Sequence, residues 1–147
     1  MTLVNVYLTF NGNCEEAFNF YASVFRKEIS DINRYNEMPP QDGMPPIPDA
    51  QKDRIMHISL PISAETMLMG SDNAEGFGPP LVVGNNFSIS VRPDSLEEAD
   101  RLFAMLSIGG QETMPMRDTF WGSYFGMTSD KFGINWMINL DQQGAES

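Results

Sequence analysis

Hydrophobic and polar residues alternate in two short segments, one near the N-terminus and one in the second half of the chain. Residues 5–10 read NVYLTF, and residues 86–91 read NFSISV. An alternation with a period of two is typical of a strand that buries one face. The positions expected to face a core are Val6, Leu8 and Phe10, and Phe87, Ile89 and Val91. The opposite face of each segment is more polar and is predicted to lie away from the helix layer, against a different surface.

Each of these segments is followed by a stretch with helical periodicity, and the two stretches open almost identically. Residues 13–25 read NCEEAFNFYASVF, and residues 95–107 read SLEEADRLFAMLS. Their apolar positions recur at the spacing i, i+3, i+4, i+7, which predicts one buried stripe on each helix. The stripes are Ala17, Phe20, Tyr21 and Val24, and Ala99, Leu102, Phe103 and Leu106.

The start of each predicted helix carries residues that cap helix N-termini. Asn13 and Ser95 stand at the N-cap, where a side-chain oxygen accepts a hydrogen bond from a backbone N–H group. Glu16 and Glu98 stand three residues later and are placed to complete a capping box. The glutamate before each of them adds negative charge where the helix dipole favours it. We interpret these glutamates as capping residues without a chemical role.

Three further strand-like segments follow each predicted helix, so the chain repeats the order βαβββ. The predicted strands are 28–35, 54–60 and 66–72, then 111–116, 122–129 and 134–140. The repeats define two modules, about 3–72 and 85–140, within a single domain of residues 1–140. Residues 36–53 are rich in proline and form a long irregular loop, a kind that is usually functional or mobile; the sequence leaves open whether it is a lid. Residues 141–147 are predicted to be a flexible tail.

A four-stranded sheet with one helix covers only one of its two faces. The uncovered face must meet another layer or a ligand. Two such sheets placed side by side are expected to form a half-open barrel with a central cavity. The predicted fold class is therefore α+β, with paired βαβββ modules around that cavity.

The composition limits the classes of partner. The 147 residues carry a net charge of −11, and no segment forms a basic stripe, so nucleic acid is not expected to bind. The apolar runs are too short to span a bilayer, and the N-terminus lacks the basic start of a signal peptide. We therefore expect a cytoplasmic protein that contacts neither nucleic acid nor a membrane.

Cys14 is the only cysteine, which excludes an internal disulfide. Its place at the start of a predicted helix is one that can lower the pKa of a thiol. A spectator thiol is the simpler interpretation, and it is the one we adopt.

Several longer motifs resemble a known family. Phe20 and Tyr21 and the closing DKFGINWMINL of residues 130–140 resemble the vicinal oxygen chelate superfamily, which holds glyoxalase I, bleomycin-resistance proteins and extradiol dioxygenases. The segments YLTFNGNCEEAFNFY, MLMGSD and DTFWGSYFGMTSDKFGINWMI resemble its PhnB-like branch, often labelled a 3-demethylubiquinone-9 3-methyltransferase-like domain. The resemblance covers about residues 3–140. It implies the glyoxalase/bleomycin resistance/dihydroxybiphenyl dioxygenase fold, a homodimer, and a functional site on the concave face of the sheet.

Metal-using members of that superfamily place His, Gln or Glu on four strands of the concave face, where a divalent ion acts as a Lewis acid. The matching positions here are Tyr7, Met67, Met69, Ser88 and Met137. None of these side chains is an imidazole or a carboxylate, and thioether sulfur is a poor ligand for Mg, Mn or Zn. We therefore expect the usual metal site to be missing and no cofactor to be bound. The glycines form no nucleotide-binding unit, so S-adenosylmethionine chemistry is not expected despite the family label.

His57 is the only histidine and the main candidate for catalysis. In RIMHISL it shares the more polar side of a predicted strand with Ile55 and Ser59. An imidazole there suits a general base or a ligand-binding donor at neutral pH. The alternative is a partly buried histidine that is hydrogen-bonded to a neighbour.

Aromatic, sulfur-containing and small polar side chains supply the other candidates for a ligand pocket. Such side chains make an adaptable wall with a few polar contacts. The predicted ligand-binding residues are Tyr7, Met69, Ser88, Trp121, Phe125 and Met137. Ordinary core packing is the alternative for each of them. Asp130 lies in the turn DKFG and is interpreted as structural.

Three functions remain open. The first, which we favour, is a protein that binds a small-molecule ligand in the cavity without the usual metal site. The second is a small-molecule lyase, isomerase or dioxygenase that uses His57 or an atypically bound divalent metal. The third is an interaction protein whose cavity is filled by its own side chains. The sequence does not identify the ligand.

Overall fold

The computed structural model describes residues 1–39, 42–43 and 45–142. The chain divides into two compact units, Met1–Val82 and Val83–Ser147. The predicted tail lies almost entirely outside the described residues, and the proline-rich loop lies partly outside them. No helix in the described ranges is long and apolar enough to cross a membrane.

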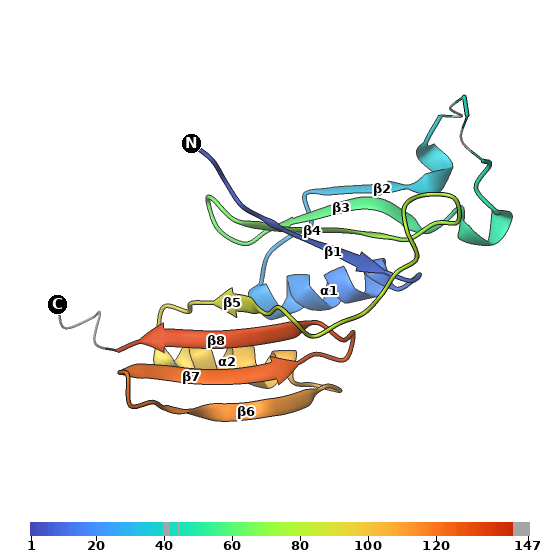
Figure 1. Cartoon of the computed structure of the whole chain (residues 1–147). Coiled ribbons are helices and arrows are strands. Elements are labelled where there is room, and N and C mark those ends of the chain that lie inside the picture. The colour runs from blue at the N-terminus through green and yellow to red at the C-terminus, as the bar shows by residue number, and fades with distance from the viewer. Residues whose placement is uncertain (40–41, 44, 143–147) are drawn as a thin grey trace. The chain divides into compact units, whose positions relative to one another are not determined.

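The first unit is a four-stranded sheet with one helix on one face (Figure 1). Its strands have the order β1-β4-β3-β2, with β1 parallel to β4 and the other neighbours antiparallel. The main elements are β1 (Val6–Phe10), α1 (Cys14–Phe25), β2 (Asp31–Arg34), β3 (Ile55–Pro61) and β4 (Met67–Asp72). Two short 3-10 helices, η1 (Tyr35–Glu37) and η2 (Asp49–Gln51), lie between β2 and β3.

The second unit repeats this arrangement, with strand order β5-β8-β7-β6 and with β5 parallel to β8. Its elements are β5 (Ile89–Val91), α2 (Leu96–Leu106), β6 (Gln111–Asp118), β7 (Ser123–Ser129) and β8 (Asn135–Asp141). The predicted order βαβββ is therefore confirmed in both halves. The predicted strand 86–91 was too long, because β5 begins only at Ile89 and Phe87 is left largely exposed.

The core of the first unit lies between α1 and the sheet. The sheet contributes Leu8, Phe10, Ile58, Leu60 and Leu68, all buried. The helix contributes Cys14, Ala17, Phe18, Tyr21 and Val24. The predicted stripe was wrong at one position, since Phe18 is fully buried and Phe20 is only half-buried. Phe18 fits because Gly70 faces it, and a Cβ atom at position 70 would come within 2.7 Å of the Phe18 ring.

The core of the second unit lies between α2 and its sheet in the same way. The predicted helical stripe of Ala99, Leu102, Phe103 and Leu106 is buried as expected. It packs against a sheet face that carries Trp136 and Ile138. Asp130 is structural, as predicted, because its carboxylate accepts hydrogen bonds from the backbone N–H groups of Phe132 and Ile134 and from the Trp136 indole.

The two helices begin by different means, and the capping prediction was only partly correct. Ser95 caps α2 as expected, since its hydroxyl oxygen accepts a hydrogen bond from the backbone N–H of Glu98 at 3.1 Å. The side chain of Asn13 makes no capping hydrogen bond. The backbone N–H of Cys14 instead donates to Asp72, which the sheet supplies from the end of β4. Glu98 pairs with Arg101.

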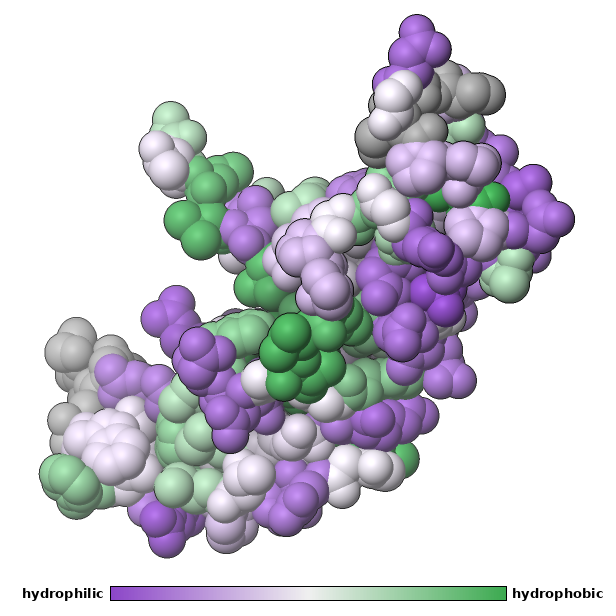
Figure 2. Space-filling view, turned by 45° about the vertical axis from the view of Figure 1, so that its right-hand side comes forward, coloured by the Kyte–Doolittle hydropathy of each residue, from purple (hydrophilic) through white to green (hydrophobic). Residues whose placement is uncertain are grey.

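Hydrophobic side chains also gather at the surface, on the segment that precedes β1 (Figure 2). Met1, Leu3 and Val4 are all exposed, and Val4 retains 89% of its accessible surface. Apolar side chains that remain exposed and contiguous commonly mark contact surfaces.

Candidate functional site

The helix-free face of the first sheet carries a row of mixed side chains. Tyr7 on β1 is the register partner of Met69 on β4, and Met69 is the partner of Ser59 on β3. Ser59 is in turn the partner of Asp31 on β2. Neighbours in register point to the same side of a sheet, and Leu8, Leu68 and Ile58 fill the opposite side. The row therefore crosses the sheet on the face that α1 does not cover.

His57 lies on this face beside Ser59, as the alternation predicted. Its Nε2 atom is 2.9 Å from the hydroxyl oxygen of Ser59, and Ser59 is only 6% exposed. The imidazole is also 5.9 Å from the Tyr7 ring, centroid to centroid, and the two planes are tilted by 32°. Tyr7 keeps about half of its surface exposed. The three side chains form a cluster with hydrogen-bonding groups and an open aromatic face.

A β-bulge removes Ile55 from the face that carries His57. The pairing of β2 with β3 shifts between Asn33 and Arg34, so that Asn33 pairs with His57 whereas Arg34 pairs with Ile55. Because the bulge inserts an extra residue, Ile55 turns to the other side of the sheet and is 1% exposed. The prediction that Ile55 shares a face with His57 was therefore wrong.

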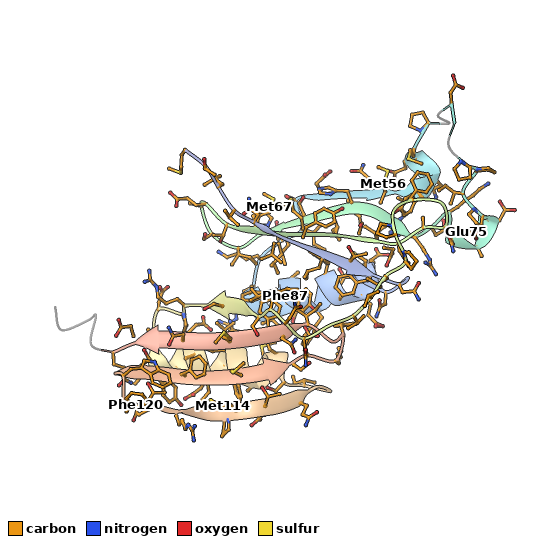
Figure 3. The ribbon with its side chains drawn as sticks, viewed as in Figure 1. Met56, Met67, Glu75, Phe87, Met114 and Phe120 are labelled. Atoms are coloured by element: carbon orange, nitrogen blue, oxygen red, sulfur yellow. The ribbon has the colours of Figure 1, made fainter. Side chains whose placement is uncertain are left out.

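The helix-free face of the second sheet is richer in sulfur. Ser90, Met137, Met127 and Met114 are successive register partners across β5, β8, β7 and β6. Figure 3 shows Met114 on β6 and Met67 at the start of β4, each in its own unit. Thioether side chains are flexible and polarizable, so they adapt to ligands of varied shape.

Phe125 and Asn139 form the next pair on the same face of the second sheet. Phe125 is 9% exposed and contacts Trp121 edge-on at 6.0 Å between ring centroids. Trp121 itself is half exposed and lies in the turn before β7. The Oδ1 atom of Asn139 is buried and has no hydrogen-bond partner among the described residues. Such an orphan acceptor is costly in a folded protein.

The structure thus distributes the predicted site residues over two faces. Tyr7, His57 and Met69 come together on the first sheet, and Phe125 and Met137 lie on the second. Ser88 lies before β5, outside the strand in which it was predicted. Ser59, Met127 and Asn139 belong to these faces and were not selected from the sequence. Each of them lies two residues from a predicted site residue on the same strand, and this spacing could have identified them.

The described residues contain no group of three or more His, Cys, Asp or Glu side chains arranged to hold a metal ion. Among the described residues of the first helix-free face, the register places one imidazole, that of His57, and one carboxylate, that of Asp31, near the Tyr7–Met69 row. The donor set of this face therefore does not fit an octahedral divalent ion, which takes hard oxygen or imidazole ligands.

Burial dominates the electrostatics beneath this face. It raises the pKa of the Cys14 thiol well above its ordinary value, and the charges of Asp72 and Glu15 add to the effect. The suggestion that a helix start lowers this pKa was therefore wrong, because the thiol is fully buried. Burial likewise raises the pKa of Tyr35, whose hydroxyl donates to the backbone carbonyl of Asp72 at 2.8 Å. A protonated, buried thiol is unreactive, which agrees with a spectator role.

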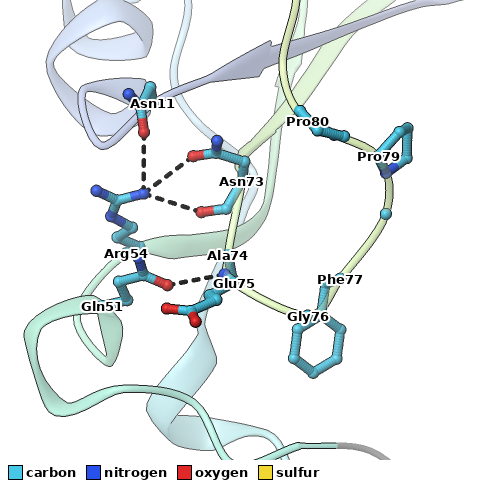
Figure 4. A pocket seen from close by; sticks show the side chains of 11 residues that line it. Asn11, Gln51, Arg54, Asn73, Ala74, Glu75, Gly76, Phe77, Pro79 and Pro80 are labelled. Atoms are coloured by element: carbon cyan, nitrogen blue, oxygen red, sulfur yellow. Dashed lines mark hydrogen bonds between the residues drawn. The ribbon is translucent and has the colours of Figure 1, made fainter.

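A distinct pocket of about 340 Å³ lies within the first unit, where β1, β3 and β4 meet the segment 73–80 (Figure 4). Its lining combines amide side chains, one arginine, one glutamate and a small apolar wall. The lining residues are Asn11, Gln51, Arg54, Asn73, Ala74, Glu75, Gly76, Phe77, Gly78, Pro79 and Pro80. No local sequence pattern indicated this pocket, because its lining residues come from three separate segments of the chain.

Comparison with known proteins gives one matching family model and several solved relatives. The family described as 3-demethylubiquinone-9 3-methyltransferase matches residues 3–139. Protein YjdN of Escherichia coli K12 is 30% identical over 142 residues, covering 93% of this chain and 94% of its own.

Several solved structures are similar to this chain over nearly its whole length. Protein PA1353 from Pseudomonas aeruginosa is 38% identical, with a TM-score of 0.81 over 97% of this chain and 99% of that one. A PhnB protein from Bacillus cereus, described as a putative 3-demethylubiquinone-9 3-methyltransferase, is 27% identical, with a TM-score of 0.73 over 95% and 99%. A glyoxylase/bleomycin resistance protein/dioxygenase domain from Frankia sp. is 13% identical, with a TM-score of 0.65 over 96% and 98%, and shows the fold alone. The predicted fold class is thereby confirmed.

Proposed function

This chain belongs to the 3-demethylubiquinone-9 3-methyltransferase family, of PhnB-like proteins with the glyoxalase/bleomycin resistance fold, and from that premise we propose that it binds a small organic molecule. The proposed binding surface is the helix-free face of the first sheet around Tyr7, His57 and Met69. The proposed binding does not use a chelated divalent ion.

The His57–Ser59 pair is the observation that carries this proposal. A hydrogen bond of 2.9 Å joins a half-buried imidazole to a buried hydroxyl on a face that no helix covers. Ser59 is 6% exposed, so its hydroxyl needs a hydrogen-bond partner, and the imidazole of His57 is that partner. The pair orients the imidazole next to the open ring of Tyr7. A ligand with a flat apolar part and a polar group would satisfy both.

The family description names a methyltransferase, but the sheets do not favour methyl transfer. Each sheet is mixed and has a single parallel pair among its strands. Nucleotide-like cofactors are typically held at the strand ends of a doubly wound parallel sheet, behind a glycine-rich turn. Neither unit provides this arrangement in its described residues, so we propose binding of a small molecule and not methyl transfer.

The lone histidine gives a direct test. Because the chain has one histidine, its ring resonances report on this face without ambiguity in an NMR titration. We expect probes such as catechol and 4-hydroxybenzoate to shift these resonances in a saturable way, and Tyr7→Ala to weaken that response at least tenfold. Tyr124→Phe is the matched control, because Tyr124 lies in the second unit and its hydroxyl donates to Asp100 of α2. Unshifted histidine resonances across a library of aromatic fragments would contradict the proposal.

A second candidate function is an enzyme of the lyase, isomerase or dioxygenase type. The observation in its favour is again the His57–Ser59 hydrogen bond, because histidine is the most frequent general acid or base and this bond fixes the orientation of the imidazole. Elemental analysis of the purified protein separates the alternatives. Stoichiometric Mn, Fe, Ni or Zn would contradict metal-free binding and favour this second function.

We further propose that the protein acts as a homodimer in the cytoplasm. The exposed apolar residues ahead of β1, including Leu3 and Val4, support a contact surface there. Light scattering coupled to size-exclusion chromatography should give a mass near twice 16.5 kDa. Leu3→Asp should shift that mass toward the monomer, and a monomeric wild-type protein would contradict the proposal.

A further inference from the structure

The pocket beside segment 73–80 contains an arginine, Arg54, that forms no ion pair with any residue that the structure describes. The Nη1 atom of Arg54 donates to the side-chain oxygens of Asn11 at 3.2 Å and Asn73 at 2.9 Å, and to the backbone carbonyl of Asn73 at 3.1 Å (Figure 4). All of these acceptors are neutral. Within the described ranges no carboxylate lies within ion-pair distance of Arg54.

The same hydrogen bonds leave part of the guanidinium available. A guanidinium has five N–H donors, and those on Nε and Nη2 of Arg54 have no acceptor among the residues that the structure describes. Gly12 lies against this part of the group, where a Cβ atom would come within 3.3 Å of Nη2. Glycine has no side chain that could shield this part of the guanidinium, and Gly12 itself is exposed. A fixed arginine with free donors is suited to hold a carboxylate through paired hydrogen bonds.

The part of the pocket lining from Asn73 to Phe77 is held in place by its own contacts. The backbone N–H of Asn73 donates to the Phe10 carbonyl at 2.7 Å, and that of Glu75 donates to the Gln51 side chain at 2.9 Å. The Phe77 ring lies 5.9 Å from the Tyr35 ring, centroid to centroid. A pocket whose wall is fixed before binding loses less conformational entropy when a ligand enters.

The carboxylate of Glu75 limits the charge that a ligand of this pocket can carry. It lines the same pocket, and its side chain is exposed and makes no ion pair with any described residue. A simple anion would be repelled by this carboxylate and by the net charge of −11. A ligand that carries an ammonium group next to its carboxylate avoids both penalties. Phe77, Pro79 and Pro80 supply an apolar wall for a small side chain.

We propose that this pocket binds a small α-amino acid, with its carboxylate on Arg54 and its ammonium group directed to Glu75. The volume of about 340 Å³ is at the lower end of the range for small-molecule sites. The site is separate from the His57 cluster. The amino-acid proposal therefore does not depend on the function proposed above. The His57 face could fail to bind a ligand while this pocket still binds an amino acid.

The test is an amide NMR titration of the full chain with L-alanine, acetate, methylammonium and inorganic phosphate as separate probes. L-alanine should shift the amides of Glu75 and Gly76 in a saturable way. Acetate and methylammonium should each bind at least tenfold more weakly than L-alanine, and phosphate should not bind. Phosphate or acetate binding as tightly as L-alanine would overturn the proposed ligand class. Unshifted pocket amides at saturating L-alanine would overturn the site itself.

Asn11→Asp tests the role of Arg54 without removing it. The new carboxylate keeps an oxygen that accepts from Nη1 but neutralises the guanidinium, so L-alanine should bind at least tenfold more weakly while the melting temperature does not fall. Asn13→Asp is the matched control, because Asn13 is exposed and its side chain makes no capping bond. It introduces the same charge two residues away and should leave binding unchanged. Equal affinity of the two variants for L-alanine would overturn the proposal.

Glu75→Gln tests the ammonium contact in the same titration. It should reduce the preference for L-alanine over acetate at least fivefold, whereas Glu65→Gln, an exposed glutamate outside the pocket, should not change it. An unchanged preference in Glu75→Gln would overturn the assignment of the ammonium group to Glu75.

Discussion

The carboxylate of Asp72, at the end of β4, accepts a hydrogen bond from the backbone N–H of Cys14, at the start of α1, across 3.0 Å. The same Oδ1 atom accepts from Gly12 at 2.8 Å, and Oδ2 accepts from the backbone N–H of Ile55 at 2.9 Å. Asp72 is 2% exposed. One buried side chain therefore joins the helix, the preceding turn and the neighbouring strand.

We predict that Asp72→Asn destabilises the protein by about 2–4 kcal/mol. The amide can still accept from one side, but its NH₂ group would face the Ile55 N–H, leaving two buried donors without an acceptor. Urea unfolding followed by circular dichroism measures the change. Asn13→Ala is the control: its side chain makes no capping bond, so it should cost less than about 0.5 kcal/mol. A larger loss for Asn13→Ala than for Asp72→Asn would contradict this account of the cap.

The cap shows which parts of the fold local sequence patterns can predict. The order βαβββ follows from the periodicity of apolar residues, which is a local property, and all eight strands and both helices were anticipated. Ser95 was also predicted correctly, since its bond to Glu98 spans three residues. Asp72 was missed because it lies 58 positions from Cys14, and no local motif reports a partner at that separation. Asn13 occupied the expected position and was replaced by this distant acceptor.

Cys14 makes the stability of the first unit dependent on pH. Burial, followed by the charges of Asp72 and Glu15, raises the pKa of its thiol above the ordinary value of 9.0. The folded state therefore keeps the proton at a pH where the unfolded chain has lost it. The stabilisation of the folded state that this proton provides is complete below pH 9, and it is lost as the pH rises further toward the folded-state pKa of the thiol.

We therefore expect the unfolding free energy to fall above pH 9 by up to about 1.4 kcal/mol per pH unit from this group. Urea unfolding at pH 8, 9 and 10 measures the slope. Cys14→Ala removes the thiol and leaves every other titratable group in the chain, so the slope of the variant should be shallower. Identical slopes, or rapid reaction of the native thiol with a disulfide reagent at pH 8, would show that the thiol is not held protonated.

Gly70 allows α1 to approach the sheet. A Cβ atom there would lie 2.7 Å from the Phe18 ring and 2.9 Å from the Leu8 carbonyl oxygen. We predict that Gly70→Ala costs about 1–3 kcal/mol, because the helix must move away from β4. Gly84→Ala is the matched control, since its nearest atom would be Asn86 Oδ1 at 3.7 Å, and it should be neutral or slightly stabilising. Equal melting temperatures for the two variants would contradict the close packing.

The candidate site was harder to anticipate than the fold, for two physical reasons. A bulge in β3 moved Ile55 off the face of His57, and bulges follow from the pairing of strands and not from one strand alone. The Arg54 pocket is assembled from residues 11, 51, 54 and 73–80, which are brought together only when the sheet has formed. His57 was found because a lone histidine in an alternating strand stands out in any sequence.

Asn139 offers the last prediction, because its buried Oδ1 atom has no hydrogen-bond partner among the described residues. A buried acceptor without a partner reduces the stability of the folded state, and an apolar residue of similar size should relieve that cost. Asn139→Leu is therefore expected to raise the unfolding free energy by about 1 kcal/mol. Asn135→Leu, on the same strand and the same face, is the control and should give no gain. A loss of stability in Asn139→Leu would show that the amide contributes favourable contacts in the folded protein, and the second face would then have to be regarded as structural.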